Sequence, residues 1–286
     1  MRGLDIPQLD LLIGRALEED RARHDITTNR LVGASQISSA RIIFKEKAVV
    51  CGAAVVERIF QALDKNARCD VRCRDGKEVR KNATVLVVQG KTRALLAGER
   101  TALNFLGYLS GIATNTRRYV RAASPYKVAI LDTRKTTPGL RELEKYAVRC
   151  GGARNHRANL EDMILVKDNH RRACRRMTVA DMIKRLRRGK RTWIEFEVDT
   201  LRQFEQALAA GADVIMLDNM NCAQMKKAAA LRNKNGKRRR PLLEASGGIT
   251  FKNIKQVART GVDRISIGAL THSRRSMDVS MEFTGE

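Results

Sequence analysis

The sequence predicts an α/β protein whose two parts differ in pattern. In the N-terminal part, strand-like stretches and helices alternate in the manner of an α+β layer, a sheet packed on helices. After Ser124-Pro125, short apolar strands alternate steadily with helical stretches. Strands that are almost continuously apolar are buried on both faces, which is typical of a parallel sheet. Polar residues and glycines follow these strands, at the edge where enzymes of this class place their sites.

The N-terminal elements are predicted from apolar spacing and turn residues. In order, they are a strand that enters a turn within residues 38–52, a helix over residues 55–63, strands within residues 67–74 and 84–89, and a long helix over residues 94–109. The pair Asp75-Gly76 predicts the turn between the two later strands. The long helix is expected to end near Gly111, because glycine is common just past a helix end.

The second part reads as repeated strand-helix units. The predicted strands are residues 127–131, 163–166, 193–198, 213–217, 242–245 and 264–267. The predicted helices between them are residues 140–150, 179–187, 201–210, 223–231 and 253–259. Right-handed crossovers can wind such units into an open sheet or a closed barrel. No Walker A or G-x-G-x-x-G sequence follows any strand, which weakens the nucleotide-fold alternatives.

Chemically useful residues stand at or just past the end of every predicted strand. In strand order they are Asp132-Thr133-Arg134-Lys135, Lys167-Asp168-Asn169-His170, Glu195 with Glu197, Asp218-Asn219, Ser246-Gly247-Gly248, and Gly268-Ala269. One such group would mean little, because loops are polar in any case. Their recurrence at the carboxyl ends of successive strands predicts one common site.

Cations and anions divide among these strand ends. The cations are Arg134, Lys135, Arg157 and Lys167, and His156 adjoins them. Arginine forks suit carboxylates and phosphates, and lysine supplies a point charge. The glycines of the last two ends would let backbone N–H groups approach a phosphate at a helix start. The pattern predicts a polyanionic ligand with carboxylates at one end and phosphates at the other.

Two acids stand between the cations and the glycines. Glu197 and Asp218 are hard oxygen ligands suited to a Mg²⁺ ion that is shared with substrate phosphates. For Glu197 the alternative is an ion pair with one of the site lysines. For each arginine or lysine taken alone, the alternative is a surface salt bridge.

Composition favours a globular protein with an unusual charge. The 286 residues are 43% hydrophobic and 30% charged, and the formal net charge is +25. Basic runs at residues 171–191 and 232–240 contribute heavily to it. Clustered cations can bind nucleic acid, but aromatic residues are only 4% and do not interleave with the runs. Nucleic-acid binding is therefore not expected, and a salt slope for duplex DNA would test it.

Cysteines and apolar runs suggest a cytoplasmic enzyme. The six cysteines form no C-x-x-C pair, so reduced thiols that pack as small apolar residues are expected. No stretch approaches the roughly 18 consecutive apolar residues of a membrane span. The first residues carry acids that a targeting segment would avoid.

The motifs resemble one family closely. The quinolinate phosphoribosyltransferases of NAD biosynthesis contain a segment similar to DTRKTTPGLRELEKYAVRCGGARNHRANLEDMILVKDNH, residues 132–170. Further similar segments are HDITT (24–28), ERTALNFLGYLSGIAT (99–114), EVD (197–199), MLDN (216–219), EASGGIT (244–250) and SIGALTHS (266–273). The resemblance spans nearly the whole chain.

The resemblance implies the fold and the reaction. It implies an N-terminal α/β sandwich domain, residues 1–112, and an incomplete, six- to seven-stranded α/β barrel, residues 113–270, of the type II phosphoribosyltransferase fold. A tail, residues 271–286, can pack back on the first domain. The expected reaction joins quinolinate to phosphoribosyl pyrophosphate and decarboxylates it to nicotinate mononucleotide. The expected assembly is a homodimer, or a larger assembly, whose partners complete each other's sites.

The resemblance also implies residue roles. The quinolinate pocket is expected to comprise Arg134, His156, Arg157 and Lys167, with Arg100 donated from the neighbouring subunit. Within one subunit Arg100 could instead pair with Glu99. The expected phosphoribosyl pyrophosphate residues are Lys135, Glu197, Asp218, Ser246, Gly247, Gly248 and Gly268, with Mg²⁺ on Glu197 and Asp218.

Two other readings remain at this point. A phosphoribosyltransferase-like protein found with molybdate-uptake systems shares parts of these motifs, but the complete TRKTTPGLR and NHR segments favour quinolinate. The second is a basic nucleic-acid-binding protein built on an inactive barrel.

Overall fold

The computed structural model describes residues 8–189, 192–234 and 240–284, and the chain divides into two compact units. The first unit comprises Met1–Arg117, Pro138–Gly152 and Ser273–Glu286, and the second comprises Arg118–Thr137 and Ala153–His272. Residues 190–191 of the first basic run and 235–239 of the second lie outside the described residues.

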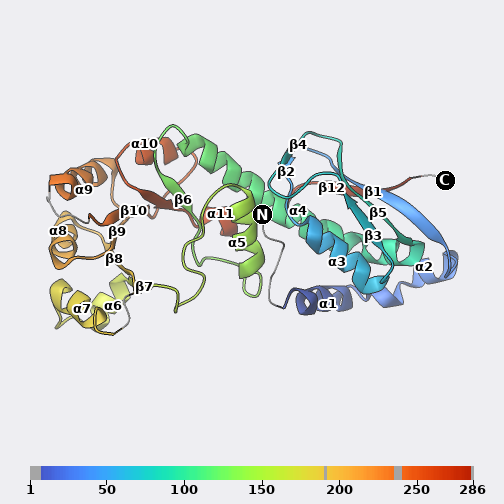
Figure 1. Ribbon diagram of the computed structural model, residues 1–286, viewed down its shortest axis with the longest axis horizontal. Helices are drawn as coiled ribbons and strands as arrows, with labels where there is room; N and C mark the ends of the chain where they lie inside the picture. Colours follow the sequence, from blue (N-terminus) through green and yellow to red (C-terminus); the bar gives the residue numbers. More distant parts are fainter. Residues whose placement is uncertain (1–7, 190–191, 235–239, 285–286) are drawn as a thin grey trace. The chain divides into compact units, whose positions relative to one another are not determined.

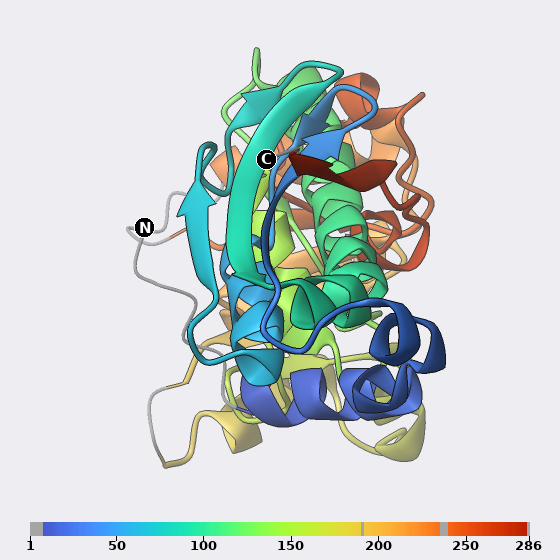
Figure 2. The same cartoon turned by 90° about the vertical axis from the view of Figure 1, so that its right-hand side faces the viewer.

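The first unit is a layer of helices and an antiparallel sheet. Its helices are α1 (Leu9–Glu19), α2 (Ile26–Leu31), α3 (Ala53–Leu63), most of α4 (Thr92–Ala123) and α5 (Arg141–Cys150), with a short 3₁₀ turn at Ala22–His24. Its strands are β1 (Ile37–Phe44), β2 (Ala48–Val49), β3 (Arg68–Val71), β4 (Glu78–Val79), β5 (Ala83–Lys91) and β12 (Val279–Thr284). The main sheet has the order β12-β1-β5-β3, and Figure 2 shows the dark red β12 beside the blue β1. The α+β layer expected for this part of the chain is confirmed.

The long helix α4 does not end where the sequence suggested. It continues through Gly111 to Ala123, so the prediction of a helix end near Gly111 was wrong. In the described structure this glycine allows a close approach instead of a turn, because a Cβ on Gly111 would overlap the carbonyl oxygen of Arg275. One turn earlier, the Gly107 carbonyl accepts a hydrogen bond of 2.9 Å from the Met277 N–H.

Adding a methyl group at this crossing should destabilise the protein. We expect Gly111→Ala to lower the free energy of unfolding by about 1–3 kcal/mol, since backbone atoms must move to admit it. Gly14, in α1, is the matched control because a Cβ there would have nothing within 4 Å. Gly14→Ala should be neutral or stabilising by about 0.5–1 kcal/mol. Urea denaturation of both variants measures the difference, and equal stabilities would contradict the assigned role of Gly111.

Helix α5 has its contacts in the first unit. Its Glu144 accepts a hydrogen bond from the Tyr108 hydroxyl, and its Tyr146 hydroxyl donates to Asp75 over 2.8 Å. This segment was expected in the domain of residues 113–270, and the expected boundary after residue 112 falls inside α4. Side-chain contacts between segments distant in sequence, which periodicity does not encode, place α5 here.

The second unit is a parallel sheet with helical crossovers. Its strands are β6 (Ala129–Leu131), β7 (Ile164–Val166), β8 (Ile194–Val198), β9 (Val214–Asp218), β10 (Leu242–Ser246) and β11 (Arg264–Ser266). Its helices are α6 (Asp168–Ala173), α7 (Val179–Leu186), α8 (Leu201–Ala210), α9 (Cys222–Lys234), α10 (Ile254–Ala258) and α11 (Ala269–His272). The strand order is β6-β11-β10-β9-β8-β7. Figure 1 shows α7, α8 and α9 along one side of β8, β9 and β10.

This sheet confirms the incomplete barrel. All its pairings are parallel, and β6 and β7 are its two edges, so the described strands do not close into a ring. All six predicted strands are present within a few residues of their expected bounds. The short helices α6 and α11 were not predicted, because they are too brief to show an apolar period. Across the described residues, no helix is both long and apolar enough to cross a membrane.

Candidate active site

One pocket occupies the carboxyl ends of the strands in the second unit. Its volume is about 880 Å³, within the range usual for ligand sites. All six strand ends contribute to its lining, which confirms the prediction of a common site. The predicted residues that line it are Arg134, Lys135, His156, Arg157, Lys167, Glu197, Asp218, Ser246, Gly247, Gly248 and Gly268.

The cations of the pocket lie close together, so their charges repel one another. Burial and the like charge of Arg134 lower the pKa of Arg157. Arg157 is anchored by a hydrogen bond of 3.1 Å from Nη1 to the Met163 carbonyl. Lys135 and Lys167 are exposed at the strand ends. Arginines brought together in a partly buried pocket favour an anionic ligand that spreads negative charge between them.

Two acids line the same pocket, Glu197 from β8 and Asp218 from β9. Glu197 is buried, and its carboxylate pairs with the Lys167 ammonium at 3.3 Å, so the ion pair kept as an alternative for Glu197 is present. The Asp168 N–H also donates to Glu197 over 3.3 Å. Burial and the charge of Glu197 raise the pKa of Asp218. Two carboxylates that oppose each other's ionisation form a set that a divalent cation would relieve.

The glycine loops are shaped for close approach. Gly247 has φ +84°, and a Cβ on it would collide with the Asn219 side chain. The next residue, Gly248, also has a positive φ of +62°. A Cβ on Gly268 would come within 3.0 Å of the Lys135 side chain. Side chains at these glycines would fill space beside the pocket, which agrees with a cradle for phosphate oxygens.

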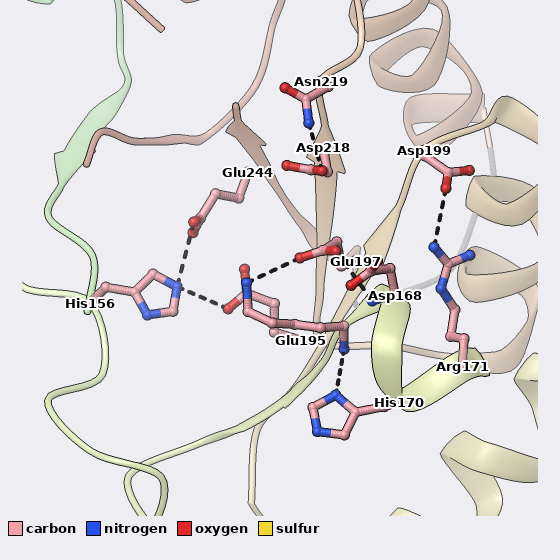
Figure 3. A network of polar contacts seen from close by, with 11 residues as sticks. His156, Asp168, His170, Arg171, Glu195, Glu197, Asp199, Asp218, Asn219 and Glu244 are labelled. Carbon is pink, nitrogen blue, oxygen red and sulfur yellow. Dashed lines mark hydrogen bonds and ion pairs between the residues drawn. The ribbon is translucent and has the colours of Figure 1, made fainter. Parts of the chain in front are cut away.

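His156 lines the pocket and faces two buried acids (Figure 3). Its Nε2 is 3.1 Å from a Glu195 oxygen and 3.4 Å from a Glu244 oxygen, and both carboxylates are 0% exposed. The Nδ1 accepts a hydrogen bond of 2.8 Å from the Arg157 N–H. Burial lowers the pKa of His156, but the two glutamates outweigh this and raise it to about 9. Burial and the charge of Glu244 raise the pKa of Glu195 in turn.

The loop that carries His156 is also held from β6. Asp132 is fully buried and accepts hydrogen bonds from the His156 N–H, 2.8 Å, and from the Asn155 amide, 2.6 Å. Asp132, Glu195 and Glu244 were expected only as members of strand ends or motifs, with no role of their own. A signal was present, because IEFEV and LLEAS place acids inside strands that are otherwise buried. Buried acids need partners, so such positions deserve a search for a nearby cation.

Two groups of side chains in the described structure have the composition of a metal site: His156-Glu195-Glu244 and Cys51-Asp75-Cys150. A ligating imidazole usually donates its second N–H, whereas the second nitrogen of His156 accepts one. Asp75 already accepts hydrogen bonds from the Gly52 and Ala53 N–H groups and from the Tyr146 hydroxyl. The Asp75 carboxylate therefore has partners without an ion, whereas Nε2 of His156 and the oxygens of Glu195 and Glu244 have no hydrogen-bond partner in the described structure. All six cysteines are free, as expected.

Arg100 lies in the first unit, on α4. It is exposed and forms no ion pair with any described residue, so pairing with Glu99 is not observed. It lines a hollow of about 270 Å³ together with Tyr108 and Met277. It is not among the residues that line the strand-end pocket. An unpaired arginine beside a hollow is available to an anion or a partner chain.

Comparison with known proteins identifies the family. Residues 25–110 match the family model "Quinolinate phosphoribosyl transferase, N-terminal domain", and residues 112–282 match the corresponding C-terminal domain. The chain belongs to the quinolinate phosphoribosyl transferase family. Among curated members, it is 43% identical to a probable nicotinate-nucleotide pyrophosphorylase [carboxylating] of Bacillus subtilis, over 97% of this chain and 94% of that protein. It is 40% identical to the Mycobacterium leprae nicotinate-nucleotide pyrophosphorylase [carboxylating], over 94% and 95%.

Solved structures of the family share the whole fold. NadC from Streptococcus pyogenes aligns with a TM-score of 0.92 at 38% identity and covers 99% of both chains. The nicotinate-nucleotide pyrophosphorylase from Francisella tularensis aligns with a TM-score of 0.91 at 36% identity, over 98% of both chains. The quinolinate phosphoribosyl transferase fold predicted from the motifs is therefore confirmed.

Proposed function

We propose that the strand-end pocket carries out the reaction of the family. The chain transfers phosphoribosyl from phosphoribosyl pyrophosphate to quinolinate with decarboxylation. The products are nicotinate mononucleotide, pyrophosphate and CO₂, a step of NAD biosynthesis. The single observation that carries this assignment is one pocket at the strand ends that is lined by clustered cations, by glycine loops and by two acids. Incubation of the protein with both substrates and Mg²⁺, followed by detection of nicotinate mononucleotide, tests it.

The cationic side is assigned to quinolinate. Arg134, Arg157 and Lys167 would face its two carboxylates, with Arg100 of a second copy completing the set. The like charges of Arg134 and Arg157 support this, because a dianion removes their repulsion. His156 would line the same end.

The other side is assigned to phosphoribosyl pyrophosphate. Ser246, Gly247, Gly248 and Gly268 would cradle its phosphates, and the Lys135 ammonium would neutralise the departing pyrophosphate. Glu197 and Asp218 fit a Mg²⁺ ion, which would supply positive charge for the pyrophosphate oxygens.

The reaction order follows from charge. The pyridine nitrogen of quinolinate forms a bond to C1 of the ribose as the bond from C1 to pyrophosphate breaks, through an oxocarbenium-like state. The ring nitrogen is then cationic, so the electron pair released when CO₂ leaves stays on the adjacent carbon as an ylide. A proton on that carbon completes nicotinate mononucleotide. The residues of the pocket hold both carboxylates during this sequence and need not donate a strong acid.

Removal of the divalent ion should abolish turnover. We expect EDTA to stop nicotinate mononucleotide formation and excess Mg²⁺ to restore it, because Glu197 and Asp218 lie beside the phosphate loops. The raised pKa of Asp218 means that its proton competes with the ion and is lost as the pH rises. The Mg²⁺ concentration for half-maximal rate should therefore increase as the pH falls. Full activity after exhaustive chelation would contradict the metal assignment.

We propose a homodimeric assembly and a cytoplasmic location. We expect a homodimer in which Arg100 of one subunit serves the pocket of the other, and its exposure on α4 supports this. A cytoplasmic location stays a prediction.

A further inference from the structure

Two buried acids beneath the pocket have no role in the scheme above. Glu195 belongs to β8 and Glu244 to β10, and both side chains are 0% exposed. In the described structure none of their four oxygens has a hydrogen-bond partner, and the Nε2 of His156, which also has none, is 3.1 Å from Glu195 and 3.4 Å from Glu244. Figure 3 shows its Nε2 facing both carboxylates.

The backbone decides which nitrogen of His156 carries its hydrogen. The Arg157 N–H donates to Nδ1, so Nδ1 must have a free electron pair. In the neutral ring the hydrogen is therefore on Nε2, the nitrogen that faces Glu195 and Glu244. Because Nδ1 accepts from the backbone and Nε2 faces the two glutamates, the ring presents its carbon atoms to the pocket.

A stability role does not explain this arrangement. Burial of two acids beside each other is costly, and apolar residues of the same volume usually serve stability as well or better. The cost is offset at this position by the cations around the loop. The charge of Glu195 favours the ionised form of Arg157, and Arg264 acts on Glu195 from β11. Asp132 holds the same loop by its backbone.

We propose that Glu195 and Glu244 are positioning residues for quinolinate, which lock the ring of His156 and, through its Nδ1, the backbone of Arg157. The proposal rests on the proposed function of the pocket. The loop has no regular structure between Arg154 and Met163, so its shape depends on such side-chain anchors. Loss of the lock should let His156 and Arg157 shift, and a displacement of about 1 Å at a substrate-positioning group can cost about 100-fold in rate.

The test uses isosteric variants that remove charge and keep shape. Glu195→Gln and Glu244→Gln should each raise the KM for quinolinate about tenfold, and the double variant about 100-fold. The KM for phosphoribosyl pyrophosphate should change less than twofold, because among the described residues no hydrogen bond or ion pair joins its assigned residues to the carboxylate of either glutamate. Asp213→Asn is the matched control. Its carboxylate is 8% exposed and pairs with Arg187 at 2.7 Å, but it precedes β9, at the opposite end from the pocket. It should leave both KM values unchanged.

A second set of variants separates positioning from folding. In a His156→Phe protein the two glutamates have no imidazole to position. Adding Glu195→Gln and Glu244→Gln to that protein should therefore raise its KM for quinolinate no further. It should also raise the melting temperature, because it removes unpaired buried acids. Losses that simply add, or a KM that rises equally for both substrates, would overturn the proposal.

A spectroscopic readout keeps the test independent of turnover. The chain has four histidines, so ¹⁵N-histidine spectra of the wild type and of His156→Phe assign the His156 ring. At a pH above the His156 pKa of about 9, we expect Nε2 protonated and Nδ1 unprotonated in the wild type, and exchange between tautomers in the double glutamine variant. A protonated Nδ1 in the wild type at that pH would overturn the proposal even if the enzyme is active. Absence of nicotinate mononucleotide from the wild type, with the expected spectra, would instead overturn the proposed function.

Discussion

Two inactive variants should restore each other when their subunits exchange. Arg100→Ala and Lys135→Ala should each be nearly inactive alone, because one lacks the proposed arginine of the quinolinate site and the other the proposed lysine of the pyrophosphate site. Arg100 lies on α4 in the first unit, whereas Lys135 lies at the end of β6 in the second. If Arg100 acts in the partner's pocket, a mixed dimer has one site with both lesions and one with neither. Activity should then recover towards about half of wild type per mixed dimer.

The expected loss for Arg100→Ala alone is large. The substitution would leave the negative charge of a substrate carboxylate without a partner in a desolvated site. The resulting fall in kcat/KM should correspond to about 2–5 kcal/mol of transition-state stabilisation. Arg15→Ala is the control, since Arg15 is also an exposed arginine on a helix of the first unit. It should retain wild-type activity. If native mass spectrometry verifies subunit exchange and mixing still restores nothing, Arg100 does not act across an interface.

The second large effect concerns substrate choice. Quinolinate should be used roughly 10⁴-fold better than nicotinate in kcat/KM, because nicotinate lacks the 2-carboxylate. Without that group, cations such as Arg134 and Arg157 keep their mutual repulsion and lose a partner. Initial rates with each acid at saturating phosphoribosyl pyrophosphate measure the ratio. Phthalate, which has both carboxylates but no ring nitrogen, is the control: it should inhibit competitively with quinolinate and never react. Comparable kcat/KM for the two pyridine acids would contradict the assignment of the cationic side.

Some of the site could be predicted because strand ends are a local pattern. Arg134, Lys167, Asp218 and Gly247 each follow an apolar run, and parallel strands place their carboxyl ends at one edge. The predicted helix end at Gly111 was wrong because the role of this glycine depends on a tertiary contact and not on a local pattern. A glycine inside a helix and one just past its end look alike in sequence, and only the path of Arg275 decides between them.

The sequence by itself determined the fold class, the family and the pocket residues, because apolar periodicity and contiguous motifs are written along the chain. Only the tertiary structure decided which buried acids meet His156, which nitrogen of that ring faces them, and that α5 packs with the first unit. Glu195 and Glu244 are far apart in sequence and lie on strands separated by β9. Their distance from one imidazole depends on strand order and side-chain direction, which exist only once the sheet has formed.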